Sequence, residues 1–137
     1  MDIKQLTPRL FVAPQLLPHD MEEIVQAGVR SIICNRPDGE SDDQPGAETI
    51  RAVASQAGLA FAHVPVVAGS PTEADAAAMR AALAALPTPI LAYCRSGARS
   101  EKLARMAAAR EKAASGDYDI LIVGGGSAGI ATAASIL

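Results

Sequence analysis

The chain has 137 residues, of which half are hydrophobic and a fifth are charged, so its composition is that of a folded globular domain. A net charge of −3 and the lack of a basic run argue against a nucleic-acid partner. No apolar run reaches the roughly 18 residues that span a bilayer, and the N-terminus lacks the long apolar core of a secretory signal. We therefore expect a cytoplasmic protein without a membrane span. Two cysteines and two isolated histidines predict neither a disulfide framework nor a metal site.

Stretches typical of strands alternate along the chain with stretches typical of helices. The predicted strands cover residues 10–13, 30–35, 60–66 and 89–93, and the predicted helices cover 19–27, 47–57, 70–86 and 100–113. Gly28 and Gly58 are suited to end the first two helices. The spacing of Ser70 and Glu73 is that of a capping box and places the start of the third helix at Ser70. The alternation predicts an α/β fold with a mainly parallel sheet of four to five strands flanked by helices.

The octet Y-C-R-S-G-A-R-S, residues 93–100, stands where the last predicted strand ends and its helix begins. In open α/β sheets, sites form at the carboxyl ends of the strands. Backbone N–H groups of such a loop and the helix dipole favour an anion, Gly97 permits the tight turn, and Arg99 adds a bidentate cation. The same positive field lowers the pKa of Cys94 and makes it a thiolate nucleophile.

Other residues of the octet and of the polar loop at residues 35–46 complete the predicted site. Ser100 is placed to hydrogen-bond the sulfur of Cys94 or to assist a leaving group. A purely structural alternative makes Cys94 a buried strand-end residue and the arginines solvated, but the strand-Cys-Gly-Arg-helix context favours function. Cys34 lies inside an apolar strand without that context, and we expect it in the core. The residues expected to bind the substrate are Arg95, Ser96, Gly97, Ala98 and Arg36.

The octet resembles the cysteine loops of two groups of enzymes. Protein tyrosine and dual-specificity phosphatases have five residues between the cysteine and the arginine, whereas four residues separate Cys94 from Arg99. This shorter span resembles the loop of single-domain rhodaneses, which often read C-R-S-G-x-R-S. A shorter loop encloses a smaller space, which suits a terminal sulfur atom on Cys94 better than a tetrahedral phosphate.

A second resemblance covers roughly residues 3–112. L-T-P-R-L-F-V-A-P-Q (6–15) is similar to the opening strand of dual-specificity phosphatases. N-R-P-D-G-E (35–40), D-Q-P (43–45) and the octet together resemble the phosphatase-like family found in beta-lactamase hydrolase-like proteins. The resemblance implies a cysteine-phosphatase-like fold with a loop of rhodanese length. Members are named phosphatases or sulfurtransferases, and their fusion to sulfur-metabolising enzymes favours sulfur chemistry.

The polar loop at residues 35–46 also offers a candidate general acid. A phosphatase needs an acid that protonates the leaving oxygen. The family resemblance makes Asp38 the best-placed carboxyl group, ahead of Glu40, Asp42 and Asp43. The P-D-G sequence around Asp38 is equally typical of a simple turn, so both roles stay open here.

The end of the chain carries a different pattern. After the first domain (1–113) and a linker (114–118), an apolar strand is followed by Gly124, Gly126 and Gly129, the dinucleotide-binding fingerprint in its strand–turn–helix context. It resembles the FAD-binding start of flavin-dependent disulfide and sulfide:quinone oxidoreductases. The expected acidic residue about 20 positions on is missing, so we expect residues 119–137 to be the truncated start of a flavin domain in a longer protein. The alternative is a glycine-rich linker with an apolar end.

Three functions compete at this point. The first is a sulfurtransferase, in which Cys94 carries a persulfide to a thiol acceptor while Arg95 and Arg99 bind a donor such as thiosulfate or glutathione persulfide. No cofactor is expected for residues 1–113, and FAD is expected only in the full-length second domain, which would supply the sulfur as a partner. The second is a cysteine phosphatase that uses Cys94, Arg99 and Asp38 on a phosphorylated substrate. The third is a non-catalytic, anion-binding regulatory module.

Overall fold

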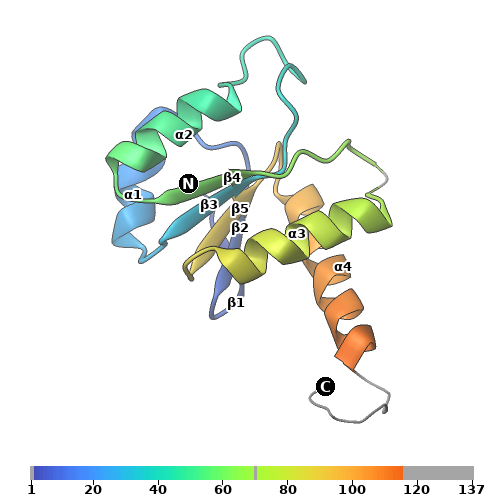
Figure 1. Ribbon diagram of the computed structural model, residues 1–137. Coiled ribbons are helices and arrows are strands. Elements are labelled where there is room, and N and C mark those ends of the chain that lie inside the picture. The colour runs from blue at the N-terminus through green and yellow to red at the C-terminus, as the bar shows by residue number, and fades with distance from the viewer. Residues whose placement is uncertain (1, 70, 116–137) are drawn as a thin grey trace. The chain divides into compact units, whose positions relative to one another are not determined.

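The computed structural model describes residues 2–69 and 71–115 (Figure 1). Its strands order as β1-β2-β5-β3-β4 in one sheet, in which β1 pairs antiparallel with β2 and all other neighbours are parallel. The mainly parallel sheet confirms the predicted fold class. β1 was not predicted, because its four residues K-Q-L-T carry little apolar pattern and are mostly exposed. The five strands are β1 (Lys4–Thr7), β2 (Leu10–Ala13), β3 (Ser31–Cys34), β4 (Ala60–His63) and β5 (Ile90–Tyr93).

Helices cover both faces of this sheet. The helical segments are η1 (Pro18–Asp20), α1 (Met21–Gln26), α2 (Ala47–Gln56), α3 (Glu73–Ala85) and α4 (Ala98–Ser115). Figure 1 shows α1 and α2 on one side of the sheet and α3 with the start of α4 on the other. Ile24 of α1 and Ile50 of α2 pack in one buried cluster with Ile32 and Leu91 of the sheet. Residues Met1–Arg105 form one compact unit, and the chain from Met106 belongs to another.

The carboxyl ends of the four parallel strands are level with one another. The last residues of neighbouring strands are register partners: Ala13 with Tyr93, Tyr93 with Cys34, and Cys34 with His63. The loops that follow these strands therefore leave the sheet along one edge, which is where sites form in open α/β sheets. Both the octet and the loop at residues 35–46 begin at this edge.

The start of α3 differs from the sequence prediction. Thr72, and not Ser70, is the N-cap: its Oγ1 accepts from the Asp75 backbone N–H at 3.1 Å, and Asp75 Oδ2 accepts from the Thr72 N–H at 2.8 Å. The sequence T-E-A-D repeats the capping-box spacing two residues after S-P-T-E, and the later pair forms the box.

Other element boundaries differ as well. The third predicted strand (60–66) ends as β4 at His63, because Pro65 has no N–H to donate to a ladder. The last helix runs through Ser115 and so takes the first two residues of the predicted linker (114–118). The rest of that linker and the predicted flavin-domain segment, with Gly124, Gly126 and Gly129, lie outside the described residues. Among the described residues, no helix is long and apolar enough to cross a bilayer.

We predict that Thr72→Ala lowers the free energy of unfolding by about 1 kcal/mol, because it removes the side-chain half of the capping box. Urea denaturation followed by circular dichroism measures the change. Thr49→Ala removes the same atoms from an exposed position inside α2 and should change stability by less than about 0.5 kcal/mol. Equal losses for the two variants would show that the Thr72 cap does not stabilise α3.

Candidate active site

Cys94 lies at the base of a tight loop between β5 and α4. Its side chain is buried, and its Sγ accepts a hydrogen bond from the Gly97 backbone N–H at 3.1 Å. α4 begins at Ala98, so the positive end of its dipole faces this loop. Gly97 has φ +92°, and a Cβ there would lie 3.3 Å from the carbonyl carbon of Ala13. Both the backbone conformation and the close approach therefore require glycine at this position.

The two cysteines differ in ionisation. Burial raises the pKa of Cys94, but hydrogen bonds from Ser100 and from the backbone N–H groups of Gly97 and Ser96 outweigh it, so the net pKa lies below that of an ordinary thiol. Burial instead raises the pKa of Cys34, whose thiol donates to the Arg36 carbonyl oxygen at 3.3 Å. Cys34 lies in the core cluster, as its apolar strand predicts. Only Cys94 combines a stabilised thiolate with a place at the carboxyl edge of the sheet.

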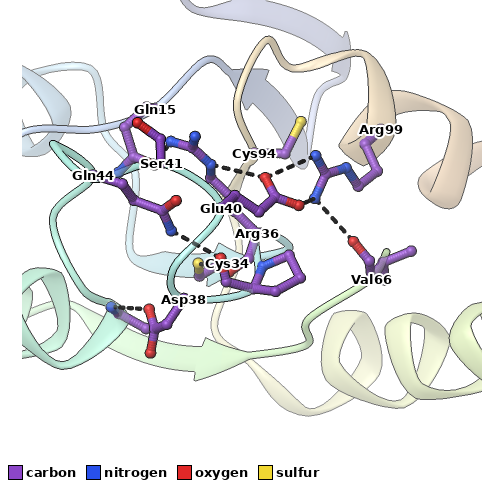
Figure 2. Close-up of polar contacts among 12 residues, drawn as sticks. Gln15, Cys34, Arg36, Asp38, Glu40, Ser41, Gln44, Val66, Cys94 and Arg99 are labelled. Carbon is purple, nitrogen blue, oxygen red and sulfur yellow. Dashed lines mark hydrogen bonds and ion pairs between the residues drawn. The ribbon is translucent and has the colours of Figure 1, made fainter. Parts of the chain in front are cut away.

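Arg99 is held in place by a carboxylate from the neighbouring loop. Its Nη1 donates to Glu40 Oε2 at 3.0 Å and to the Val66 carbonyl oxygen at 2.9 Å, while its Nη2 donates to Glu40 Oε1 at 3.2 Å (Figure 2). These bonds use both Nη1 protons and one Nη2 proton, so the guanidinium keeps donors for a bound anion. The Arg99 side chain is only 10% exposed, which further limits its freedom.

Glu40 bridges Arg99 to a second arginine. Arg36 is 4% exposed, and its Nε donates to Glu40 Oε1 at 3.0 Å while its Nη1 donates to Gln15 Oε1 at 2.9 Å (Figure 2). Hydrogen bonds from Arg99, and then from Arg36, hold the pKa of Glu40 below its usual range. A carboxylate held ionised in this way is a poor proton donor. Glu40 therefore positions the arginines and does not suit the acid role that sequence alone left open.

Asp38 is turned away from the cysteine loop. Its Oδ1 accepts from the backbone N–H of Ala47, the first residue of α2, at 2.8 Å. Figure 2 shows Asp38 directed toward the start of that helix, on the far side of Arg36 from Cys94. This is the geometry of a turn that caps a helix, the second of the two roles that the sequence left open. The structure does not bring Asp38 to Cys94.

The remaining predicted residues occupy the rim and the interior of the loop. Arg95 and Ser96 are exposed, and Ser96 Oγ accepts from the Ala98 backbone N–H at 3.4 Å. Ser100 is fully buried, and its hydroxyl lies 2.8 Å from Oδ1 of Asn35. We did not predict Gln15, Asn35 or Val66 as site residues from the sequence. Only Asn35 could have been found from the sequence, because it is a polar residue at the end of the predicted apolar strand 30–35.

Comparison with known proteins places this site in a family. The profile described as the phosphatase-like domain of beta-lactamase hydrolase-like proteins matches residues 2–111. The chain belongs to this family. A beta-lactamase hydrolase-like protein of Xylella fastidiosa (strain Temecula1) is 40% identical over 100 residues, which make up 73% of this chain and 23% of that protein. The chain thus spans about a quarter of the length of the curated relatives that it matches.

Solved structures carry the same fold. A protein of Neisseria meningitidis, described as a candidate phosphatase, is 38% identical, has a TM-score of 0.73, and is aligned over 86% of this chain and 81% of its own. A second solved structure, from Shewanella putrefaciens, is 24% identical, has a TM-score of 0.70, and is aligned over 81% of this chain and 69% of its own. At this identity the likeness shows the fold alone. The family resemblance predicted for residues 3–112 is confirmed. The flavin oxidoreductase expected beyond it stays a prediction.

We predict that alkylation of the native protein modifies Cys94 with a midpoint below the ~8.5 of a free thiol. The thiolate is the reactive form, and a lowered pKa means that the rate rises at lower pH. Iodoacetamide labelling followed by peptide mass mapping measures both cysteines. Cys34, whose pKa is raised by burial, should react slowly, and Cys94→Ser should lose the fast phase. Faster labelling of Cys34, or an unshifted midpoint for Cys94, would contradict the electropositive loop described above.

Proposed function

We propose that this domain is a cysteine-dependent phosphatase that hydrolyses phosphate esters through a phosphocysteine on Cys94. The observation that carries the proposal is the geometry of the loop, in which a thiol with a lowered pKa and a guanidinium fixed by Glu40 meet at the start of α4. Membership of a phosphatase-like family supports it as well. This ranking reverses the order that the sequence alone suggested, since sulfur transfer was preferred there.

Each residue of the site has its own role in the proposed reaction. The Cys94 thiolate attacks phosphorus, the Sγ–P bond forms and the bond to the leaving oxygen breaks. The free donors of Arg99 and the loop N–H groups bind the non-bridging oxygens and stabilise the charge that they gain in the transition state. Water then displaces Sγ from phosphorus, which regenerates the thiolate and yields inorganic phosphate. Arg36 acts indirectly, since its bond to Glu40 helps to fix Arg99.

We infer that no carboxyl group of the loop at residues 35–46 protonates the leaving group. Glu40 is ion-paired with two arginines, and Asp38 is bonded to the start of α2. Asp43 accepts a hydrogen bond from Ser41, while Asp42 is exposed. In this arrangement the leaving group departs as an anion, and esters of acidic alcohols react fastest.

Sulfur transfer is the second candidate, and one observation favours it. The span of four residues between Cys94 and Arg99 makes a small loop, and sulfite leaves thiosulfate as an anion that needs no acid. In this reaction Cys94 attacks the sulfane sulfur, and the persulfide then passes its outer sulfur to a thiol acceptor. Arg95 and Arg99 would bind the anionic donor. A flavin domain elsewhere in a longer protein, holding FAD, would be the partner that supplies the sulfur.

We predict that the 137-residue chain hydrolyses 4-nitrophenyl phosphate and that Cys94→Ser abolishes the activity. Arg99→Lys loses the bidentate geometry and should lower kcat by about 10²–10³, the usual cost of removing one transition-state donor. Arg105→Lys is the matched control, because that exposed arginine pairs with Glu101 on the surface of α4 and should leave kcat unchanged. Release of nitrophenolate measures the rate.

The same preparation distinguishes the other functions. A chain that is inert on aryl phosphates, yet transfers sulfur from thiosulfate to cyanide in a Cys94-dependent reaction, would replace the phosphatase by a sulfurtransferase. If phosphate or sulfate protects Cys94 from alkylation and the chain turns over neither substrate, the domain is a regulatory anion-binding module.

We predict that Asp38→Asn slows hydrolysis of 4-nitrophenyl phosphate and of phenyl phosphate by the same factor, because Asp38 protonates neither leaving group. Asparagine still accepts from the Ala47 N–H, so the helix cap persists. Loss of a general acid would instead slow the hydrolysis of phenyl phosphate, whose phenol is less acidic, by a further factor of about 10²–10⁴. The ratio of the two kcat/KM values decides, and Asp42→Asn is the control on the same loop.

A further inference from the structure

The loop that follows β4, residues 64–72, lies directly against the arginine of the site. The Val66 carbonyl oxygen accepts from Arg99 Nη1 at 2.9 Å (Figure 2), and the Val66 N–H donates to the Asn35 carbonyl oxygen at 3.0 Å. The next residue, Val67, is 75% exposed. The sequence of the loop, V-P-V-V-A-G-S-P-T, holds no carboxyl group. Next to its bond with Arg99, this loop therefore exposes an apolar side chain and offers no acid.

Carboxylates of the other loops at this edge have hydrogen-bond partners of their own. In the segment that follows β2, residues 14–20, Asp20 accepts from a backbone N–H of its own turn at 2.8 Å. In the loop at residues 35–46, Asp38 is bonded to the start of α2. Hydrogen bonds from Arg99 to Glu40, and from a neighbouring hydroxyl to Asp43, hold the pKa of both carboxyl groups below its usual range. These groups suit the role of acceptors and not that of proton donors.

The need for a proton donor depends on the oxygen that leaves phosphorus. A phenol such as that of tyrosine ionises near pH ~10, so its oxygen leaves as a strongly basic anion unless an acid protonates it. A carboxylic acid ionises near pH ~4, so a carboxylate departs without a proton. A general acid contributes about 10²–10⁴ to a rate, and a site without one loses that factor on esters of phenols and alcohols but not on anhydrides.

Two kinds of phosphate anhydride release an anion of this sort, and the charges around Cys94 favour one of them. A phosphoanhydride brings a second charged phosphoryl group to the site, whereas an acyl phosphate brings a carboxylic acyl group. The segments 35–46 and 94–99 carry three arginines and four carboxylates, namely Arg36, Arg95, Arg99, Asp38, Glu40, Asp42 and Asp43. This balance does not attract a second phosphoryl group, and the exposed Val67 suits a hydrocarbon chain.

We propose that the substrates of this site are acyl phosphates, the mixed anhydrides of phosphoric and carboxylic acids. The proposal rests on the proposed phosphatase function and names its substrate class. The Cys94 thiolate attacks phosphorus, the Sγ–P bond forms, and the bond from phosphorus to the acyl oxygen breaks with its electron pair on the departing carboxylate. Water then attacks phosphorus and the P–Sγ bond breaks. Both protons of the water stay on the inorganic phosphate, and Cys94 is again a thiolate.

A comparison of benzoyl phosphate with phenyl phosphate tests the proposal, because both carry one aromatic ring and differ in the oxygen that leaves. The measured quantity is kcat/KM, which includes the step that releases benzoate or phenol, and chromatography of these two products gives the rates. Hydrolysis in the presence of Cys94→Ser measures the spontaneous reaction and is subtracted. We expect kcat/KM to be larger for benzoyl phosphate by about 10²–10⁴, and the ratio to stay the same in Asp42→Asn, which removes an exposed carboxylate of the loop.

Each other outcome has a distinct meaning. Similar kcat/KM values for the two substrates, both dependent on Cys94, would overturn the acyl phosphate proposal and leave the phosphatase intact, since a group of the protein would then protonate the phenol. Faster Cys94-dependent hydrolysis of inorganic pyrophosphate than of benzoyl phosphate would overturn it in favour of phosphoanhydrides. If the chain hydrolyses none of these substrates and not 4-nitrophenyl phosphate either, the phosphatase function itself is wrong and the substrate class falls with it.

Discussion

The level register of β5 between β2 and β3 is the constraint on which the site depends. Because Tyr93 pairs with both Ala13 and Cys34, Cys94 leaves the sheet at the same height as the loops on either side. The pairing continues for one more residue through the bond from the Asn35 N–H to the Tyr93 carbonyl oxygen. A slip of one residue would turn the side chains of the strand to the other face of the sheet and separate Cys94 from its neighbours.

The charges at this edge are arranged by the loop at residues 35–46. Arg36 and Arg99 would repel one another if no anion lay between them, and Glu40 accepts hydrogen bonds from both. The three side chains together carry one net positive charge beside the cysteine loop. Arg36 is almost completely buried, so removal of Glu40 would leave a buried cation without its partner, which is strongly unfavourable. The loop at residues 35–46 therefore contributes to the proposed anion site, although it does not contain Cys94.

Much of the fold and of the proposed site could be predicted from the sequence, because the residues that determine them are close together in the chain. An apolar strand, a cysteine, a glycine and an arginine entering a helix indicate a strand-end anion site in any open α/β sheet. The bridge from Glu40 to Arg99 could not be predicted, because it joins residues 59 positions apart through loop geometry that no periodicity encodes. The same holds for Gln15 and Arg36. The choice between two roles for Asp38 also depended on where the start of α2 lies relative to the loop, which strand and helix patterns leave undetermined.

If this domain is a cysteine phosphatase, Cys94 forms a covalent bond with phosphorus during turnover. Acid quenching of the wild-type chain during hydrolysis of 4-nitrophenyl phosphate, followed by peptide mass mapping, tests it directly. We expect a phosphoryl group on the peptide that contains Cys94, and on no other peptide. Turnover without that group on Cys94, or with the group on a different residue, would show that Cys94 is not the nucleophile.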